Sequence, residues 1–319
     1  MISSRLIKIL SLLLVFWSCN KEDKDVFTSS VDTTDTVWVD NSPTSTKTDF
    51  QHLLDTLSTP AEIRQISDIK SKQSISFADD VVVDIPASSF KDESGRQAEG
   101  PAIVAFWLLN NRGEMIRNHF SNISNDEALK TAFAFKLSII QNGKELVLSG
   151  NKETEIFLGD DNAESGFKLY KEVPASNRTN WTQTSDGRIS VDRHNSKKGY
   201  SIELEQLGWL LAGQEFKSDK STSITASLPK IFTNANTKLY VLLNDRKGML
   251  EMGQDKNQKS FFANNIPTNS TGVVVSISSI NNNYYLGTQE IELKHKLHIK
   301  INPSIISLAE LNAFMDNLQ

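Results

Sequence analysis

Hydrophobic and polar positions alternate with a period of two along several stretches of the chain. Because successive side chains of a β-strand point to opposite faces of a sheet, this alternation predicts strands with one buried face. The apolar positions of the three clearest runs are Phe133, Phe135, Leu137 and Ile139; Val273, Val275 and Ile277; and Ile291, Leu293, His295, Leu297, Ile299 and Ile301.

Turn-forming sequences separate these runs and favour tight connections between antiparallel strands. The clearest turns are 92–95, 142–143, 185–187 and 281–283, which are rich in Asp, Asn, Ser and Gly. About a dozen short strands with such turns, and no alternation of strands with helices, are typical of antiparallel sandwiches. The predicted fold is therefore mainly β, with two antiparallel β-sandwich domains and a short C-terminal helix.

Two short helices are expected beside the strands. The first spans 49–57, where three leucines share one helical face: Leu53, Leu54 and Leu57. The second begins near Ser307 and Glu310, whose spacing is that of a capping box. An apolar stripe follows this cap and consists of Leu308, Leu311, Met315 and Leu318. We expect this C-terminal helix to pack on the second sandwich.

The N-terminus has the three parts of an export signal. Arg5 and Lys8 provide positive charge. They are followed by an apolar run from Ile9 to Trp17 and then by Ser18. A membrane-spanning helix needs about 20 apolar residues, so this run is too short to be one. Its length suits the central region of a signal peptide.

The only cysteine of the chain, Cys19, directly follows Ser18. A cysteine after a small residue at this place resembles the signal of bacterial lipoproteins. In that family the cysteine receives a diacylglycerol and becomes the first residue of the mature protein, which implies lipid attachment at Cys19. The resemblance covers only the first nineteen positions, and Phe16 and Trp17 depart from the usual pattern. The alternative is an ordinary signal peptide with an incidental cysteine.

A short cluster of charged residues occupies positions 20–25, directly behind Cys19. It resembles the acidic export tag of surface lipoproteins from Bacteroidetes-type bacteria. The resemblance implies a protein of the bacterial cell envelope, attached to the outer membrane as a lipoprotein and exposed at the cell surface. The alternative interpretation is a solvated start of a linker.

The composition changes along the chain and suggests its domain organisation. Residues 19–60 are rich in Ser, Thr and Asp and carry few large apolar side chains, which predicts a flexible tether. The polar, glycine-flanked stretch 159–166 is the best candidate for a boundary between domains. We therefore expect a lipoprotein signal peptide at 1–18, the tether at 19–60, a first sandwich at 61–159 and a second β-rich domain at 160–319.

Two groups of segments resemble a known family. Residues 83–90, which end in Ile-Pro-Ala-Ser-Ser-Phe, precede an acidic glycine turn at 92–95 and then Gly100-Pro101. This order resembles the opening of ZU5-like and Ig-like β-sandwich modules. Gly208-Trp209 and Tyr240-Val241 resemble the second half of Bacteroidetes-type lipoproteins that carry such a module. The resemblance implies an extracytoplasmic protein of two sandwiches, and the family offers no catalytic residue to carry over.

Composition and motifs narrow the classes of function. The 319 residues include 34 Lys and Arg against 39 Asp and Glu, a net charge of −5 that argues against a nucleic-acid partner. One cysteine can form neither an internal disulfide nor a cysteine-rich metal site. The sequence lacks the nucleophile elbow, the dinucleotide fingerprint, the phosphate-binding loop and the zinc-protease motif. We expect no enzyme and no cofactor.

Two clusters invite a metal interpretation. His295 and His298 are three positions apart, and on a strand their rings point to opposite faces, with His295 expected to be buried. Oxygen ligands for calcium gather in the acidic loop at 160–164, but Ser165 stands where a calcium loop needs glycine. We interpret this loop as an acidic linker and expect no metal site.

Aromatic residues supply the remaining candidates. Trp181, Tyr284 and Tyr285 have polar neighbours in the sequence, which favours exposed contacts with a ligand, whereas Trp107 and Trp209 lie in apolar runs and are expected in the core. The leading hypothesis is a lipid-anchored, non-enzymatic binding or structural module with a protein or glycan ligand. A glycan-binding lipoprotein of a polysaccharide uptake system and an extracytoplasmic hydrolase with dispersed active residues are the alternatives.

Overall fold

The structure is a computed structural model that describes residues 37–39, 49–125, 127–150, 153–173, 180–215, 220–244 and 248–318. Cys19, the expected signal peptide and the charged cluster behind it lie outside these residues. Within the described part, no helix has the length and apolar composition that crossing a membrane requires.

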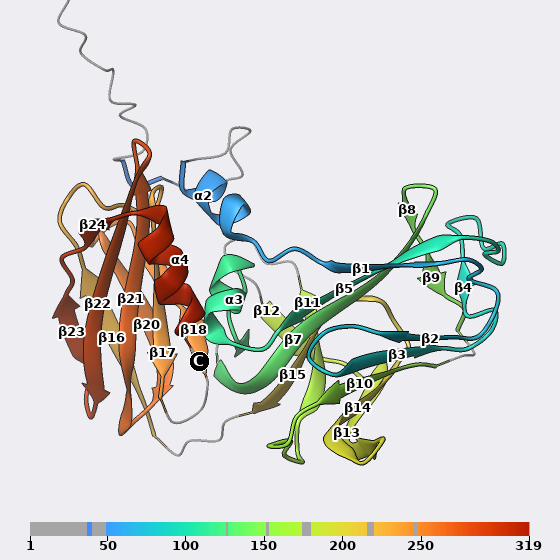
Figure 1. Cartoon of the computed structure of the whole chain (residues 1–319). Helices are drawn as coiled ribbons and strands as arrows, with labels where there is room; N and C mark the ends of the chain where they lie inside the picture. Colours follow the sequence, from blue (N-terminus) through green and yellow to red (C-terminus); the bar gives the residue numbers. More distant parts are fainter. Residues whose placement is uncertain are drawn as a thin grey trace, which may run out of the picture. The chain divides into compact units, whose positions relative to one another are not determined.

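Two sheets form the first β-sandwich (Figure 1). The strand order is β1-β5-β7-β15-β11-β12 in one sheet and β13-β14-β10-β3-β2 in the other. The strands are β1 (Glu62–Ile66), β2 (Gln73–Ser76), β3 (Val81–Ile85), β5 (Ala102–Leu109), β7 (Glu127–Gln141), β10 (Thr154–Gly159), β11 (Lys168–Val173), β12 (Asn180–Gln183), β13 (Gly187–His194), β14 (Lys197–Leu204) and β15 (Gly208–Glu215). Short strands beside them are β4 (Phe90–Lys91), β6 (Ile123–Ser124), β8 (Lys144–Glu145) and β9 (Val147–Leu148).

Two further sheets form the second sandwich, with the strand orders β19-β20-β16-β23 and β18-β17-β21-β22-β24. The strands are β16 (Ser221–Ser227), β17 (Thr237–Leu243), β18 (Met249–Glu251), β19 (Gly253–Asp255), β20 (Ser260–Pro267), β21 (Ser270–Ile280), β22 (Asn283–Leu293), β23 (Leu297–Lys300) and β24 (Ser304–Ile306). Neighbouring strands are antiparallel except β16 and β23. The mainly β fold of two antiparallel sandwiches predicted from the alternation is confirmed.

The first sandwich extends further along the chain than the expected boundary at 159–166. Strands from both sides of this stretch share its sheets, since β14 pairs with β10 and β15 pairs with β7. The sandwich therefore continues to Glu215, and the second begins at Ser221. The glycine-flanked segment is a connection inside the first sandwich, where Tyr200 accepts a hydrogen bond from the amide of Glu164 (3.0 Å).

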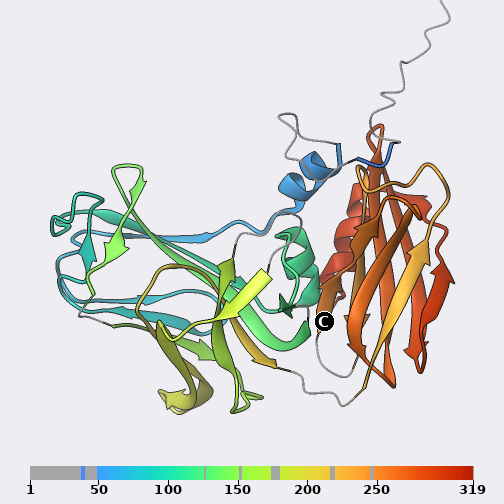
Figure 2. The same cartoon turned by 180° about the vertical axis from the view of Figure 1, so that it is seen from behind.

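Among the described residues, three short helices pack between the two sandwiches (Figures 1 and 2). They are α2 (Asp49–Leu57), α3 (Arg112–Arg117) and α4 (Leu308–Asp316). Their apolar faces join the outer face of β7, β11 and β15 to the outer face of β17 and β21 in a third hydrophobic core. Because this core is shared, both sandwiches belong to one compact unit.

Both expected helices are present. In α2, Leu53, Leu54 and Leu57 are buried in the shared core, as their spacing predicts. At the start of α4, the Ser307 hydroxyl accepts a hydrogen bond from the Glu310 amide, and the Glu310 carboxylate accepts one from the Ser307 amide. These reciprocal bonds satisfy backbone donors that a helix N-terminus otherwise leaves free.

The apolar alternation from Ile291 to Ile301 belongs to two strands instead of one. β22 ends at Leu293 in one sheet, and β23 begins at Leu297 in the opposite sheet. His295 lies in the connection and is exposed, so the expectation that it is buried is wrong. The alternation continues because both strands face the same core, but it does not reveal the crossing between sheets.

The expected tether is not uniform. Val37, Trp38 and Val39 are described beside the second sandwich, where the ring of Trp38 packs on Phe261 with centroids 5.2 Å apart. The side-chain amide of Asn234 accepts a hydrogen bond from the Val39 amide (2.9 Å) and donates one to the Val39 carbonyl (2.8 Å). Together with α2, this contact shows that two parts of the segment 19–60 pack on the folded unit.

Candidate functional site

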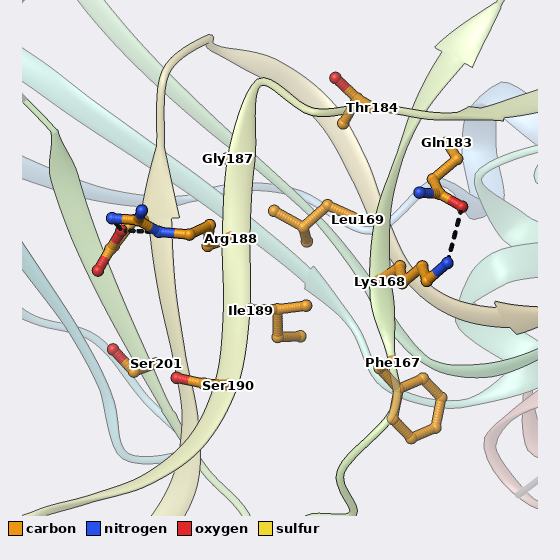
Figure 3. A pocket seen from close by; sticks show the side chains of 11 residues that line it. Phe167, Lys168, Leu169, Gln183, Thr184, Gly187, Arg188, Ile189, Ser190 and Ser201 are labelled. Atoms are coloured by element: carbon orange, nitrogen blue, oxygen red, sulfur yellow. Dashed lines mark hydrogen bonds and ion pairs between the residues drawn. The ribbon is translucent and has the colours of Figure 1, made fainter.

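A cavity of about 480 Å³ lies at the open edge of the first sandwich, between β11 and β13 (Figure 3). Its volume is in the usual range for a site that binds a small ligand, roughly 300–1,000 Å³. The lining residues are Phe167, Lys168, Leu169, Gln183, Thr184, Gly187, Arg188, Ile189, Ser190, Ser201 and Glu203. Leu169 and Ile189 belong to the apolar interior of the sandwich, whereas most of the other side chains carry hydrogen-bonding groups.

The charged groups of the cavity have partners in the protein: Lys168 bonds to an uncharged amide, and Arg188 pairs with carboxylates. On one side, Lys168 Nζ lies 3.3 Å from Gln183 Oε1. On the other side, Arg188 Nε donates to Glu203 Oε2 (2.6 Å), and Glu153 lies 3.6 Å from the same guanidinium. Figure 3 shows Arg188 on one side of β13, and Lys168 with Gln183 on the other. Hydrogen bonding is therefore the chemistry that these side chains offer to a ligand.

The turn at 185–187 sets one end of the cavity. Gly187 has φ of +149°, and a Cβ atom there would lie 2.6 Å from the Glu203 carbonyl oxygen, so only glycine lets β13 begin so close to β14. The Asp186 amide donates to the Thr184 hydroxyl (3.0 Å). The Lys171 ammonium, 3.2 Å from the Asp186 carboxylate, lowers the pKa of that carboxyl.

The strand β13 presents its backbone edge to the cavity. It is the last strand of its sheet and pairs only with β14 among the described strands. Four consecutive residues, 187–190, line the cavity although their side chains alternate between the two faces of the sheet. Consecutive lining residues indicate that the main chain of this edge contributes to the wall. Unpaired main-chain groups of an edge strand can accept a further strand.

Trp181 is not the exposed ligand contact that its polar neighbours suggested. Its ring is completely buried, and its Nε1 donates a hydrogen bond to the Ser121 carbonyl (2.7 Å). Phe120 packs against it with ring centroids 5.3 Å apart. The Ser121 hydroxyl also accepts a hydrogen bond from the Glu251 amide (3.0 Å), so Trp181 belongs to the connection between the two sandwiches.

Tyr284 and Tyr285 are half-buried on opposite faces of β22. Tyr284 packs against the shared core, and Tyr285 packs edge-on against Phe232 with centroids 5.3 Å apart. Neighbouring strand positions point to opposite sides of a sheet, so these two rings form no common platform. Trp107 and Trp209 are half-buried rather than fully buried, with ring centroids 6.1 Å apart.

The acidic loop at 160–164 is held by contacts within the first sandwich. Asp160 Oδ1 accepts a hydrogen bond from the Asn162 amide (2.8 Å), and the Glu164 carboxylate pairs with Lys130. Across the described ranges, no three His, Cys, Asp or Glu side chains gather in a metal-binding arrangement. The histidines His295 and His298 are both exposed.

No protein-family model matches the sequence, and no curated protein matches it. The turn at 185–187 is the only feature of the cavity that the sequence analysis predicted. The remaining lining residues lie on four strands or directly beside them, and ordinary residue types such as Gln183 and Ser201 carry no motif that would select them. Contact across the edge of the sandwich, which the sequence pattern does not specify, brings them together.

Proposed function

We propose that this protein is a lipid-anchored, non-enzymatic binding module of the bacterial cell envelope, and that it holds an extended segment of a partner protein at the β13 edge. The observation that carries this proposal is the run of consecutive residues 187–190 along the cavity wall. A partner segment that adds a strand to a free edge gains main-chain hydrogen bonds, while neighbouring pockets select its side chains.

The cavity supports binding of this kind through its side chains as well. Lys168 and Gln183 line the cavity on the β11–β12 side. Ser190 and Ser201 are directly opposite each other on paired strands and offer two hydroxyls. An extended peptide presents alternating donors and acceptors that these groups can bind. The carboxylate of Glu203 already pairs with Arg188, which favours recognition over acid–base chemistry.

Attachment to the membrane is the second part of the proposal and depends on the N-terminal sequence. Arg5, Lys8, the apolar run and Cys19 support lipidation, and the charged cluster at 20–25 supports export to the surface of the outer membrane. The resemblance to Bacteroidetes-type lipoproteins with ZU5-like or Ig-like modules agrees with a protein of two sandwiches. Acyl chains contribute about 0.8 kcal/mol for each buried methylene, so several chains give stable anchoring.

The binding site can be tested with the purified full-length protein, a library of extended peptides and an array of oligosaccharides. We expect peptides to bind, and the double variant Lys168→Ala/Gln183→Ala to weaken their binding by about tenfold, equivalent to about 1.4 kcal/mol. The matched control, Lys144→Ala/Glu93→Ala, removes an exposed pair (2.9 Å) elsewhere in the same sandwich and should leave binding unchanged.

Two results would contradict the proposed site. Peptides that bind wild type and the cavity variant equally well would place recognition elsewhere on the protein. Binding of oligosaccharides alone, with loss in the cavity variant, would replace the peptide with a glycan and favour the glycan-binding lipoprotein.

A further inference from the structure

One end of the second sandwich carries the segment through which the chain arrives from Cys19. Val37, Trp38 and Val39 lie there, fixed by Asn234 and Phe261 as described above. The connections 228–236, 256–259, 281–283 and 301–303 are at this same end, because Thr237 pairs with Ser278 and Ser227 pairs with Lys300. We call this surface the tether end.

The tether end exposes large apolar side chains. Val37, Ile231 and Ile305 are exposed to 55%, 50% and 62% of their surface. Tyr285 lies beside Ile305 on the neighbouring strand and is half-buried. In the described part of the chain, the other large hydrophobic residues that are this exposed belong to the first sandwich. Exposed apolar groups that gather at one place mark a surface that meets a protein or a membrane.

The tether end is also basic, in contrast to the acidic chain as a whole. Its four connections contain Lys230, Lys256 and Lys259 and no Asp or Glu. Lys300 stands at the adjoining end of β23, and Asp255 stands at the adjoining end of β19. Lys230, Lys259 and Lys300 are exposed. Lysines near an anionic membrane are attracted to its surface, so this charge fits acidic lipid headgroups.

The length of chain between the proposed lipid and the tether end limits where this end can be. About eighteen residues separate Cys19 from Val37, and at full extension they span at most roughly 60 Å. The segment joins the folded unit at Val37–Val39. Of the described surfaces of the second sandwich, the tether end is therefore separated from the proposed lipid by the fewest residues.

We propose that the tether end is a membrane-facing surface, on which Ile231 and Ile305 enter the interface while the lysines bind acidic headgroups. This inference rests on the lipid anchoring proposed above and adds an orientation to it. The second sandwich then lies next to the membrane, and the first sandwich, with its cavity, is the part available to a partner.

Site-specific fluorescence can test the orientation in the full-length acylated protein. An acylated Cys19 has no free thiol, so a probe attached to Ile231→Cys or Ile305→Cys reports one position. The protein is reconstituted into vesicles of phosphatidylcholine and phosphatidylglycerol that contain brominated quencher lipids. We expect quenching at positions 231 and 305. Two control positions should show none: His295→Cys, at the opposite end of the second sandwich, and Val147→Cys, in the first sandwich.

Charge reversal tests the role of the lysines. Lys230→Glu/Lys259→Glu/Lys300→Glu should reduce the quenching at position 305, and raised salt should reduce it in the wild-type background because salt screens exposed charges. The matched control reverses lysines at the opposite end, in Lys220→Glu/Lys294→Glu/Lys296→Glu, and should leave the quenching unchanged.

Labelling with a fatty-acid analogue, measured on the same samples, separates the possible failures. An acylated protein whose probes at 231 and 305 are quenched no more than those at 295 and 147 would overturn the orientation alone. A protein that carries no acyl chain would overturn both the orientation and the lipid anchor. Equal melting temperatures of the cysteine variants confirm that each retains the fold.

Discussion

Trp181 shows how a single residue joins the two sandwiches. Its indole N–H donates a hydrogen bond to the buried Ser121 carbonyl. The Ser121 hydroxyl in turn accepts a hydrogen bond from the Glu251 amide. The sequence places Trp181 between Asn180 and Thr182, and these polar neighbours suggested exposure. Its burial comes from the segment around Phe120, sixty residues earlier, so no pattern local to Trp181 could predict it.

Replacement of this indole should therefore affect stability. In Trp181→Phe the Ser121 carbonyl loses its partner inside the protein, which costs about 1–3 kcal/mol in the free energy of unfolding. Denaturant unfolding of the variant measures this loss. Trp107→Phe, at a half-buried ring on the outer face of the same sheet, serves as the control and should change stability less. An equal effect in both variants would contradict the assigned role of Trp181.

Asp92 gives the fold a pH dependence that the turn at 92–95 explains. Hydrogen bonds from the Ser94 hydroxyl and from the Arg96 amide and side chain lower the pKa of Asp92 to about 2. A carboxyl whose pKa is lower in the folded state stabilises the fold above its unfolded pKa. This contribution is present above about pH 4 and is lost as the pH falls towards 2.

The expected result is a stability difference between wild type and Asp92→Asn that is constant from pH 7 to about pH 4 and shrinks below it. Denaturant unfolding at a series of pH values measures the difference. Asp161→Asn, at an exposed position of another loop, is the control. A difference that grew towards pH 2 would show that the ionised Asp92 does not stabilise the turn.

At the scale of elements, the sequence predicts structural features that depend on residues a few positions apart. It does not predict features that depend on which strands pair. The capping box at Ser307 and the leucine face of α2 need only residues within a few positions, and both are present. The alternation at 291–301 cannot show that the chain crosses to the opposite sheet after Leu293. In the same way, the pairings of β15 with β7 and of β14 with β10 show that the first sandwich continues past 159–166, and no pattern near that stretch does.

The packing of α3 against α4 depends on a glycine that no motif marks. A Cβ atom on Gly113 would lie 1.9 Å from the Met315 carbonyl oxygen. The two helix backbones can therefore come this close only because position 113 is glycine. Arg117 adds to the contact by donating to the Asn312 carbonyl (2.9 Å) and to Asp316 Oδ1 (2.7 Å). The C-terminal helix is thereby fixed to the first sandwich as well as to the second.

Gly113→Ala should separate these helices and destabilise the protein by about 1–3 kcal/mol, the usual cost of overpacking. Denaturant unfolding and hydrogen exchange of the α4 amides measure the effect. Gly150→Ala provides the matched control, because a Cβ atom there meets nothing within 4 Å. Unchanged stability and exchange in Gly113→Ala would mean that the helices do not pack as closely as the structure shows.

At the scale of the whole molecule, the shared core explains why two sandwiches form one unit. The sequence predicted the mainly β fold because period-two alternation depends on burial, which every strand of a sandwich shares. It could not predict the cavity, whose residues come together only when the edges of two sheets meet. The proposed attachment depends on Cys19 and is independent of these contacts.

Cys19→Ala tests the central claim most directly. Cells that express wild type or the variant are labelled with a fatty-acid analogue and separated into membrane and soluble fractions. We expect wild type to carry the label in the outer-membrane fraction. The variant should lack the label and move to the soluble fraction, with an unchanged melting temperature because position 19 lies outside the compact unit at 34–319. An unlabelled wild type, or a variant that stays in the membrane fraction, would contradict a lipid-anchored protein.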